Sequence, residues 1–281
     1  MIDAIWRKGV FLAGDIRRLS HWPFLTWAKD EHKVSYEEAL GALPLIRYGD
    51  VGLHRDRGYL SNLAIPGFMK HAWIHVLDAN VDRNLYGPVD EYYQIVEAIS
   101  EGVVCRSPLY AMRSDYVIVL EPKSIGRYFV SSTMPEIADR MSSERADEFR
   151  KGACLKARRM VGMPYDHRFE FNIDEELKYY QTTGDRMSSF PRNYLQAAAN
   201  QFRRYDIAFT CTELVAYAWW HLREQLGIER RTKYGKRVIL ADDFINENWR
   251  IRWASESVTV DVAASMGLHE EGIEMVRGFR R

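Results

Sequence analysis

The stretch Phe209-Thr210-Cys211-Thr212-Glu213-Leu214-Val215-Ala216-Tyr217 has the features of a helix start with a cysteine in its first turn. Thr210 and Glu213 fit the S/T-x-x-E capping box, in which the threonine hydroxyl and the glutamate carboxylate each accept a hydrogen bond from a first-turn or cap amide. This box places Cys211 at the first helical position. Apolar side chains then recur at helical spacing, at positions 211, 214, 215, 218 and 222, and predict one buried helix face.

The position of Cys211 predicts an unusual thiol. Unpaired amides and peptide dipoles at a helix N-terminus favour an anion, so they lower the pKa of a sulfur placed there. Cys211 is therefore a candidate nucleophile. The simpler interpretation is a buried cysteine that only packs, which is the common role of a lone cysteine on an apolar helix. Cys105 and Cys154 do not lie at helix starts, so packing is the role expected for both.

The composition is that of an ordinary globular protein. Its 281 residues suffice for one large domain or two small ones, and we expect one domain with extensions. Basic and acidic residues balance at 39 each, and no long basic run is present, which argues against a nucleic-acid partner. Three scattered cysteines are too few for a disulfide framework or a CxxC metal site. A reducing compartment and no metal are expected.

The first residues lack the features of a classical export signal. Asp3 introduces an early acid, and the apolar run from Gly9 to Gly14 is too short for a signal-peptide core. No apolar run reaches the length that spans a bilayer. We therefore expect a cytoplasmic protein without a transmembrane segment, while export by another route or incorporation in a larger assembly stays open.

Short apolar runs predict a series of strands after a different N-terminal segment. Residues 1–46 are expected to form a helical, partly amphipathic extension with aromatic contacts. From Tyr48, apolar runs bounded by Gly, Asp and Pro predict strands. These runs lie at 50–53, 72–77, 103–105 and 116–120, with a further candidate at 251–260. Residues 89–99 fit either a helix or a strand.

The second half of the chain is expected to alternate helices with an insertion. Residues 146–160 carry a helical apolar stripe that ends with Gly162 and Pro164. Residues 171–208 are acidic at first and then rich in Ser, Gly and Pro, which predicts an inserted lid or cleft segment. A surface helix is expected from Asp261. The predicted units are an extension at 1–46, a domain at 47–260 and a tail at 261–281.

A thiol nucleophile needs a base, and histidine suits that role near neutral pH. His71 and His75 flank an apolar triplet at the head of a predicted strand, where a period of two puts both side chains on one face. Either is a candidate base, and a histidine satisfied in the core is the alternative. The remaining histidines are expected in polar, helical or loop settings, with His54 in a loop beside charged residues.

Several separated segments occur in an order that is typical of a known family. They are Tyr48-Gly49-Asp50-Val51, Gly58 to Phe68, His71-Ala72-Trp73-Ile74-His75-Val76, Val96-Glu97-Ala98-Ile99 with Gly102-Val103-Val104, Gly162-Met163-Pro164-Tyr165-Asp166, and Phe209 to Val215. Together they resemble the permuted papain-like amidases of the YaeF/YiiX group, within the NlpC-like cysteine hydrolase superfamily. The resemblance covers residues 47–255, and ordered matches are more specific than a single motif.

The resemblance implies an α+β, circularly permuted papain-like fold, with an antiparallel sheet packed against the cysteine helix. Position by position, it makes Cys211 the nucleophile, His71 the base and Glu97 the carboxylate that orients the base. An ordinary surface acid is the alternative for Glu97, and Gln94 or Glu91 could replace it if the strand register differs.

The resemblance also implies an oxyanion hole and a reaction. The backbone amide of Cys211 is the expected first donor, and Tyr165 is a candidate for the second. The implied reaction is hydrolysis of an amide, in a peptide, a peptidoglycan peptide or an acyl lipid, through a thioester acyl-enzyme and without a cofactor.

Two alternatives stay open, of which the first is still an enzyme and the second belongs to another class. One is a thioesterase or lipid acyltransferase similar to lecithin retinol acyltransferase, and the other is a non-catalytic binding or structural module of a larger assembly. The connection from Asp166 to Thr210 is longer than is usual in the family, which makes transfer of a substrate from relatives unsafe. The fold does not choose among these substrates.

Overall fold

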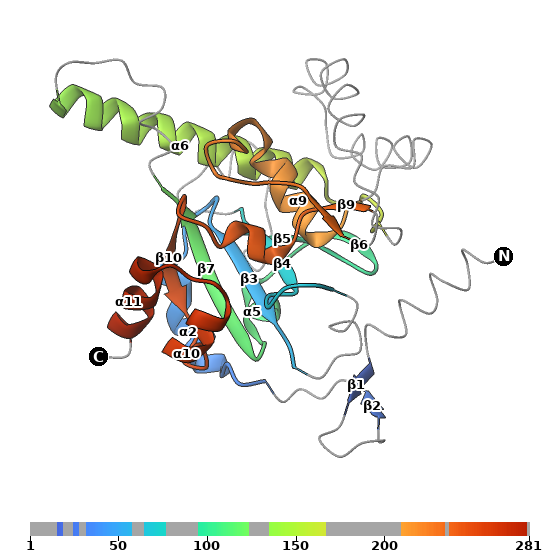
Figure 1. Cartoon of the computed structure of the whole chain (residues 1–281). Helices are drawn as coiled ribbons and strands as arrows, with labels where there is room; N and C mark the ends of the chain where they lie inside the picture. The colour runs from blue at the N-terminus through green and yellow to red at the C-terminus, as the bar shows by residue number, and fades with distance from the viewer. Residues whose placement is uncertain are drawn as a thin grey trace.

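A six-stranded antiparallel sheet forms the centre of the computed structural model, in the order β10-β7-β3-β4-β5-β6 (Figure 1). The structure describes residues 16–18, 25–27, 32–57, 65–76, 95–123, 135–166, 209–233 and 236–279. The strands are β3 (Val51–Arg55), β4 (His71–His75), β5 (Ile95–Ile99), β6 (Gly102–Arg106), β7 (Tyr116–Pro122) and β10 (Trp249–Ala254). All neighbouring pairs are antiparallel. The expected α+β class with an antiparallel sheet is confirmed.

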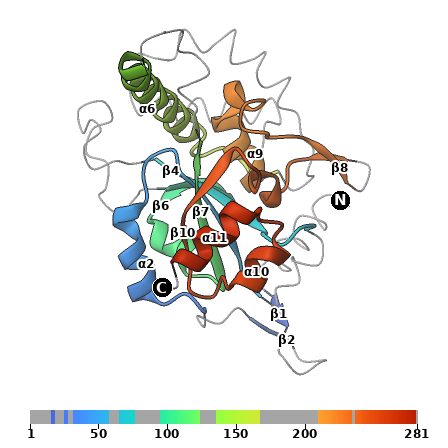
Figure 2. The same cartoon turned by 60° about the vertical axis from the view of Figure 1, so that its left-hand side comes forward.

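One face of the sheet carries the larger hydrophobic core. Strand residues such as Leu53 and Ile74 pack there with α6 (Pro135–Arg159) and α9 (Cys211–Ala218). These two helices lie side by side along the sheet (Figures 1 and 2). The buried stripe of α6 includes Ala153 and Ala157, as the helical spacing predicts. Each of these helices therefore buries the apolar face that its sequence predicts.

A second hydrophobic cluster covers the opposite face of the sheet. It joins Trp73 and other strand residues to α2 (Tyr36–Ala42) and α5 (Pro108–Met112). Ser35 caps α2, because its hydroxyl accepts from the amide of Glu38 at 3.0 Å. The buried residues Ala39 and Ala42 of α2 belong to this cluster, so the part of the chain just before residue 47 contributes to the core of the sheet.

The N-terminal segment differs from its expected helical form. Residues Ile16–Arg18 (β1) and Leu25–Trp27 (β2) pair as antiparallel strands. The expectation of helix is therefore wrong at these positions, where β-branched and aromatic residues favour extended backbone. The inserted lid or cleft segment that is expected at residues 171–208 lies outside the described residues.

The C-terminal part also differs from its expected form. Two helices, α10 (Val260–Ser265) and α11 (Glu270–Gly278), replace the single surface helix predicted from Asp261. Gly267 separates them with a φ of 79°, a conformation that glycine adopts without strain. Both helices contribute buried side chains to the larger core, among them Ala263 and Val276. They lie against the β10 side of the sheet (Figure 2).

Shorter elements complete the described chain. They are the 3-10 helices η1 (Leu43–Leu45), η4 (Trp220–Leu222) and η5 (Ala241–Phe244), and the strand pair β8 (Arg231–Lys233) and β9 (Lys236–Val238). The ambiguous stretch 89–99 contains strand β5 at its end. No described helix is both long enough and apolar enough to cross a bilayer.

Buried ion pairs fix α6 to the sheet. Asp50, which is fully buried, lies 2.8 Å from Nη1 of Arg150 and 2.7 Å from Nε of Arg252. Arg252 also pairs with Glu121 on β7. Burial raises the pKa of Asp50, although both arginines act to lower it. The helix and three neighbouring strand segments are therefore held by charges as well as by apolar packing.

Candidate functional site

The helix that begins at Cys211 has the predicted cap. Thr210 Oγ1 accepts from the Glu213 amide at 3.3 Å, and Glu213 Oε2 accepts from the Thr210 amide at 2.8 Å. Cys211 is the first residue of α9 and is buried. The hydroxyl of Thr212 donates to the carbonyl of Ile239 at 2.7 Å. The turn that carries the thiol is therefore held from within the helix and from outside it.

The backbone just before the helix is fixed by a second segment of the chain. The amide of Phe209 donates to the carbonyl of Pro164, and the amide of Asp166 donates to the carbonyl of Phe209, each at 3.1 Å. Tyr165, between them, forms a parallel bridge with Phe209. The two ends of the chain that flank residues 167–208 thus meet next to Cys211.

His71, the first residue of β4, lies between a carboxylate and the thiol. Its Nε2 is 2.7 Å from Oε2 of Glu97, whose side chain is fully buried on the neighbouring strand β5. The ring also interacts electrostatically with Cys211, and each group shifts the pKa of the other. Since Glu97 occupies Nε2, the nitrogen left for the sulfur is Nδ1. The structure thus brings together the three residues that the resemblance implies.

The loop before His71 is held close to the thiol. Asp242 of η5 accepts from the amides of Phe68 at 2.5 Å and Met69 at 2.7 Å. The carbonyl of Lys70, the next residue, lies 4.0 Å from the Cys211 sulfur. The sequence did not indicate this anchor, because Asp242 is far from the loop along the chain.

The charges of the site favour a thiolate beside an imidazolium. Burial by itself would raise the pKa of the Cys211 thiol, but the charge and hydrogen bond of His71 and the amides of Ala72 and Thr212 lower it. Burial opposes the protonation of His71, yet Cys211 and Glu97 raise its pKa to about 10. An ion pair at neutral pH is the state that these shifts favour.

Glu97 is ionised in spite of its burial. Burial acts to raise its pKa, but His71 and Arg106 together lower it to about 2. Arg106, on β6, forms an ion pair with Oε1 of Glu97, and its guanidinium lies 5.5 Å from the centre of the Tyr110 ring. Arg106 carries no local sequence signal that marks it as part of the site. The requirement that a buried carboxylate on an inner strand be paired with a cation could have indicated it.

The other two cysteines are unlike Cys211. Burial raises the pKa of Cys154 to about 12 and that of Cys105 to about 11. The Cys154 thiol donates to the carbonyl of His75 at 3.4 Å. Both cysteines are therefore protonated at neutral pH, in agreement with their predicted packing roles.

Of the two histidines left open as base, His71 is the one that bonds to Glu97. His75 is buried at the other end of β4. His54, in contrast, is not in the expected loop but on β3, opposite His71 in the strand register. The alternation of Val51 and Leu53 with other residues could have placed His54 on a strand.

Tyr165 lies within the electrostatic reach of the thiol. Burial and the negative charges of Cys211, Glu213 and Asp166 raise its pKa well above the usual value for tyrosine. Its hydroxyl therefore keeps its proton and can donate a hydrogen bond. This is the property that the predicted second oxyanion donor needs.

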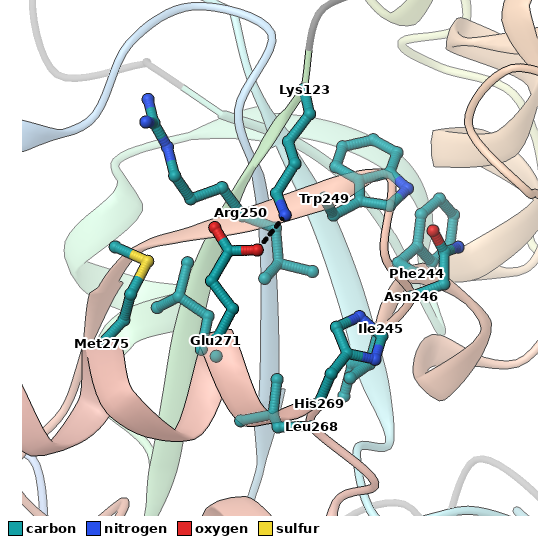
Figure 3. A pocket seen from close by; sticks show the side chains of 13 residues that line it. Lys123, Phe244, Ile245, Asn246, Trp249, Arg250, Leu268, His269, Glu271 and Met275 are labelled. Atoms are coloured by element: carbon teal, nitrogen blue, oxygen red, sulfur yellow. Dashed lines mark hydrogen bonds and ion pairs between the residues drawn. The ribbon is translucent and has the colours of Figure 1, made fainter.

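A hollow on another part of the surface is separate from this site. It lies between β10, η5 and α11, and its lining includes Trp249, Leu268 and Met275 (Figure 3). An ion pair of 2.6 Å between Lys123 and Glu271 borders it. None of the three residues Cys211, His71 and Glu97 lines this hollow. Within the described parts of the chain, no group of three or more His, Cys, Asp or Glu side chains could hold a metal ion.

Comparisons with protein-family models, with curated proteins and with solved structures each found no match.

Proposed function

We propose that this protein is a cysteine hydrolase with a circularly permuted papain-like fold, which cleaves an amide bond through Cys211, His71 and Glu97. The observation that carries the proposal is the placement of a helix-capped thiol next to a histidine whose other ring nitrogen is bonded to a buried carboxylate. Three groups in this arrangement fit a nucleophile, its base and an orienting acid. The substrate class proposed is a peptide, a peptidoglycan peptide or an acyl amide.

The order of the elements supports the permuted form of the fold. The strands that carry His71 and Glu97 precede the helix of Cys211 along the chain, whereas papain has its cysteine first. Geometry rather than sequence order defines such a triad. Contacts of α9 with β4 and with β5 bring the three residues to one place.

The reaction starts from the ion pair. The Cys211 thiolate attacks the amide carbonyl carbon, and the C=O electron pair moves onto oxygen to give a tetrahedral oxyanion. When this intermediate collapses, the C–N bond breaks and Nδ1 of His71 gives its proton to the leaving amine. Water then attacks the thioester while His71 takes its proton, and the thiolate leaves as the acid product is released.

The groups around the reacting carbon have defined tasks. Glu97 holds the His71 ring through Nε2 and stabilises its positive charge. The Cys211 amide belongs to the first turn of α9, whose amides lack partners within the helix, and it can donate to the oxyanion. The protonated hydroxyl of Tyr165 is the proposed second donor.

Selective alkylation tests the proposal without knowledge of the substrate. We expect iodoacetamide to modify Cys211 at pH 6, where Cys105 and Cys154 stay protonated, with peptide mapping by mass spectrometry as the measurement. Cys211→Ser supplies the control, in which the fast reaction should disappear. Equal and slow modification of all three cysteines would contradict the nucleophile assignment.

A trapped acyl-enzyme identifies the substrate class. Wild-type protein incubated with an amide or ester library and quenched in acid should carry a mass increase on the peptide that contains Cys211. An aminoacyl adduct supports the amidase. A fatty acyl adduct would instead support the thioesterase or acyltransferase alternative.

A further inference from the structure

The His71 ring has a second histidine as its neighbour. His54 of β3 is the cross-strand partner of His71. Next to this pair, the Lys70 amide donates a hydrogen bond of 3.1 Å to the His54 carbonyl. The centres of the two rings are 4.6 Å apart, with an angle of 31° between their planes. This is the range of a ring-packing contact. In the sheet order, β4 lies between β3 and β5, so His71 has His54 on one side and Glu97 on the other.

The environment of His54 keeps its ring neutral. Burial and the positive charge of His71 lower the pKa of His54 to about 4. Other charged groups act on it with opposite signs, since Asp56 and Glu97 raise its pKa and Arg106 lowers it. Its Nδ1 is enclosed and has no hydrogen-bond partner within the described parts of the chain. A ring without charge can approach an imidazolium without the repulsion that two cations would have.

A purely structural explanation for His54 is incomplete. Strand positions next to a buried core usually carry apolar residues, and an enclosed nitrogen without a partner is unfavourable. The adjacent pair on the same face is Gly52 with Trp73, and the Trp73 ring covers Gly52 so closely that a Cβ there would lie 1.9 Å from it. His54, with its unpaired nitrogen, is thus the direct cross-strand partner of His71, the proposed base.

We propose that His54 is a positioning residue, whose neutral ring packs on His71 and holds it where Nε2 meets Glu97 and Nδ1 faces Cys211. The proposal rests on the proposed function, because it assigns His54 to the same site. His54 does not exchange a proton in the reaction. It restricts the rotation of the His71 ring, so that the base keeps both hydrogen bonds when its charge changes.

The test measures the rate of Cys211 alkylation by iodoacetamide between pH 4 and pH 9, in the wild type, His54→Ala and His54→Phe. Phenylalanine keeps a flat ring, whereas alanine removes it. In the wild type, the alkylation rate should rise with pH at a lower pH than for an ordinary thiol. We expect His54→Ala to shift this rise toward the higher pH of an ordinary thiol and to slow alkylation at pH 6 by about tenfold. His54→Phe should stay within about threefold of the wild type. His269→Ala, on the exposed start of α11, is the matched histidine control and should have no effect.

The outcomes separate this proposal from the proposed function. If the alkylation of wild-type Cys211 has the pH profile of an ordinary thiol, the proposed function itself is refuted, independently of His54. If the alkylation rate rises at low pH in the wild type and at the same low pH in His54→Ala, the positioning role is refuted while the nucleophile assignment stands. If His54→Ala and His54→Phe slow the alkylation of Cys211 equally, His54 does not position His71 by packing of its ring. If His54→Ala does not fold, the pKa of His71 is measured by NMR in His54→Phe instead. The proposal requires this pKa to stay raised, and a return to the usual histidine value would refute it.

Discussion

Replacing Glu97 by glutamine tests the electrostatic account of the site most directly. The carboxylate is fully buried and contacts both His71 and Arg106. Its pKa falls from 4.5 to about 2, which corresponds to about 3 kcal/mol of stabilisation at about 1.4 kcal/mol per pKa unit. Removal of one partner from a buried ion pair costs about 3–5 kcal/mol in other proteins. We therefore expect Glu97→Gln to lower the free energy of unfolding by about 3 kcal/mol at pH 7.

The stabilisation by Glu97 should depend on pH in a defined direction. Because the pKa of Glu97 is lower in the folded state, its stabilisation is fully present above pH 4.5 and is lost as the pH falls toward 2. The difference between wild type and Glu97→Gln should therefore shrink to about half near pH 3. Urea denaturation followed by tryptophan fluorescence at several pH values measures both quantities.

Two further variants control for the substitution itself. Glu101→Gln changes an exposed glutamate in the turn after β5 and should alter the free energy of unfolding by less than about 0.5 kcal/mol. The double variant Glu97→Gln/Arg106→Met should recover part of the loss, because no guanidinium is left without its partner. If Glu97→Gln matches the Glu101 control at pH 7, or if its effect does not decrease with falling pH, the reasoning is refuted.

Four other substitutions follow from the geometry. Thr210→Ala removes the cap hydroxyl and should cost about 1 kcal/mol in chemical denaturation, and an unchanged stability would argue against the cap. Gly52→Ala places a Cβ 1.9 Å from an indole ring and should destabilise the fold by about 1–3 kcal/mol or more. Gly152→Ala, with no neighbour within 4 Å, should stabilise its helix by about 0.5–1 kcal/mol, and equal effects of the two alanines would count against close packing at residue 52. Asp242→Ala should speed hydrogen exchange at two amides of the loop 65–70, whereas protection as in the wild type would show that another group holds them.

Local sequence features predicted the elements of the site. The cap at Thr210 and the stripe that follows it depend on neighbours within one or two turns, so the helix of Cys211 could be located from the sequence. The strand of His71 followed in the same way from a short apolar run. The position of Glu97 required the resemblance, because the periodicity of residues 89–99 fits both a helix and a strand.

Contacts between distant segments could not be predicted in this way. Arg106 reaches Glu97 through the register of a hairpin, and His54 meets His71 through the pairing of two strands. A shift of one residue in either register would turn these side chains to the other face. The anchoring of the loop by Asp242 depends on a segment more than 170 residues away. Such contacts are set by the packed sheet and leave no local pattern.

The pairing of Pro164 and Asp166 with Phe209 has a consequence for how this protein can diversify. The chain departs after Asp166 and returns at Phe209, two points that backbone hydrogen bonds of 3.1 Å already join. The entropy of closing a loop changes only slowly with its length, so insertions and deletions between these points disturb the core little. Cys211 keeps its position whatever length of chain lies between these two points. Residues 167–208 can therefore be exchanged for a segment of another length while Cys211 and its neighbours keep their positions.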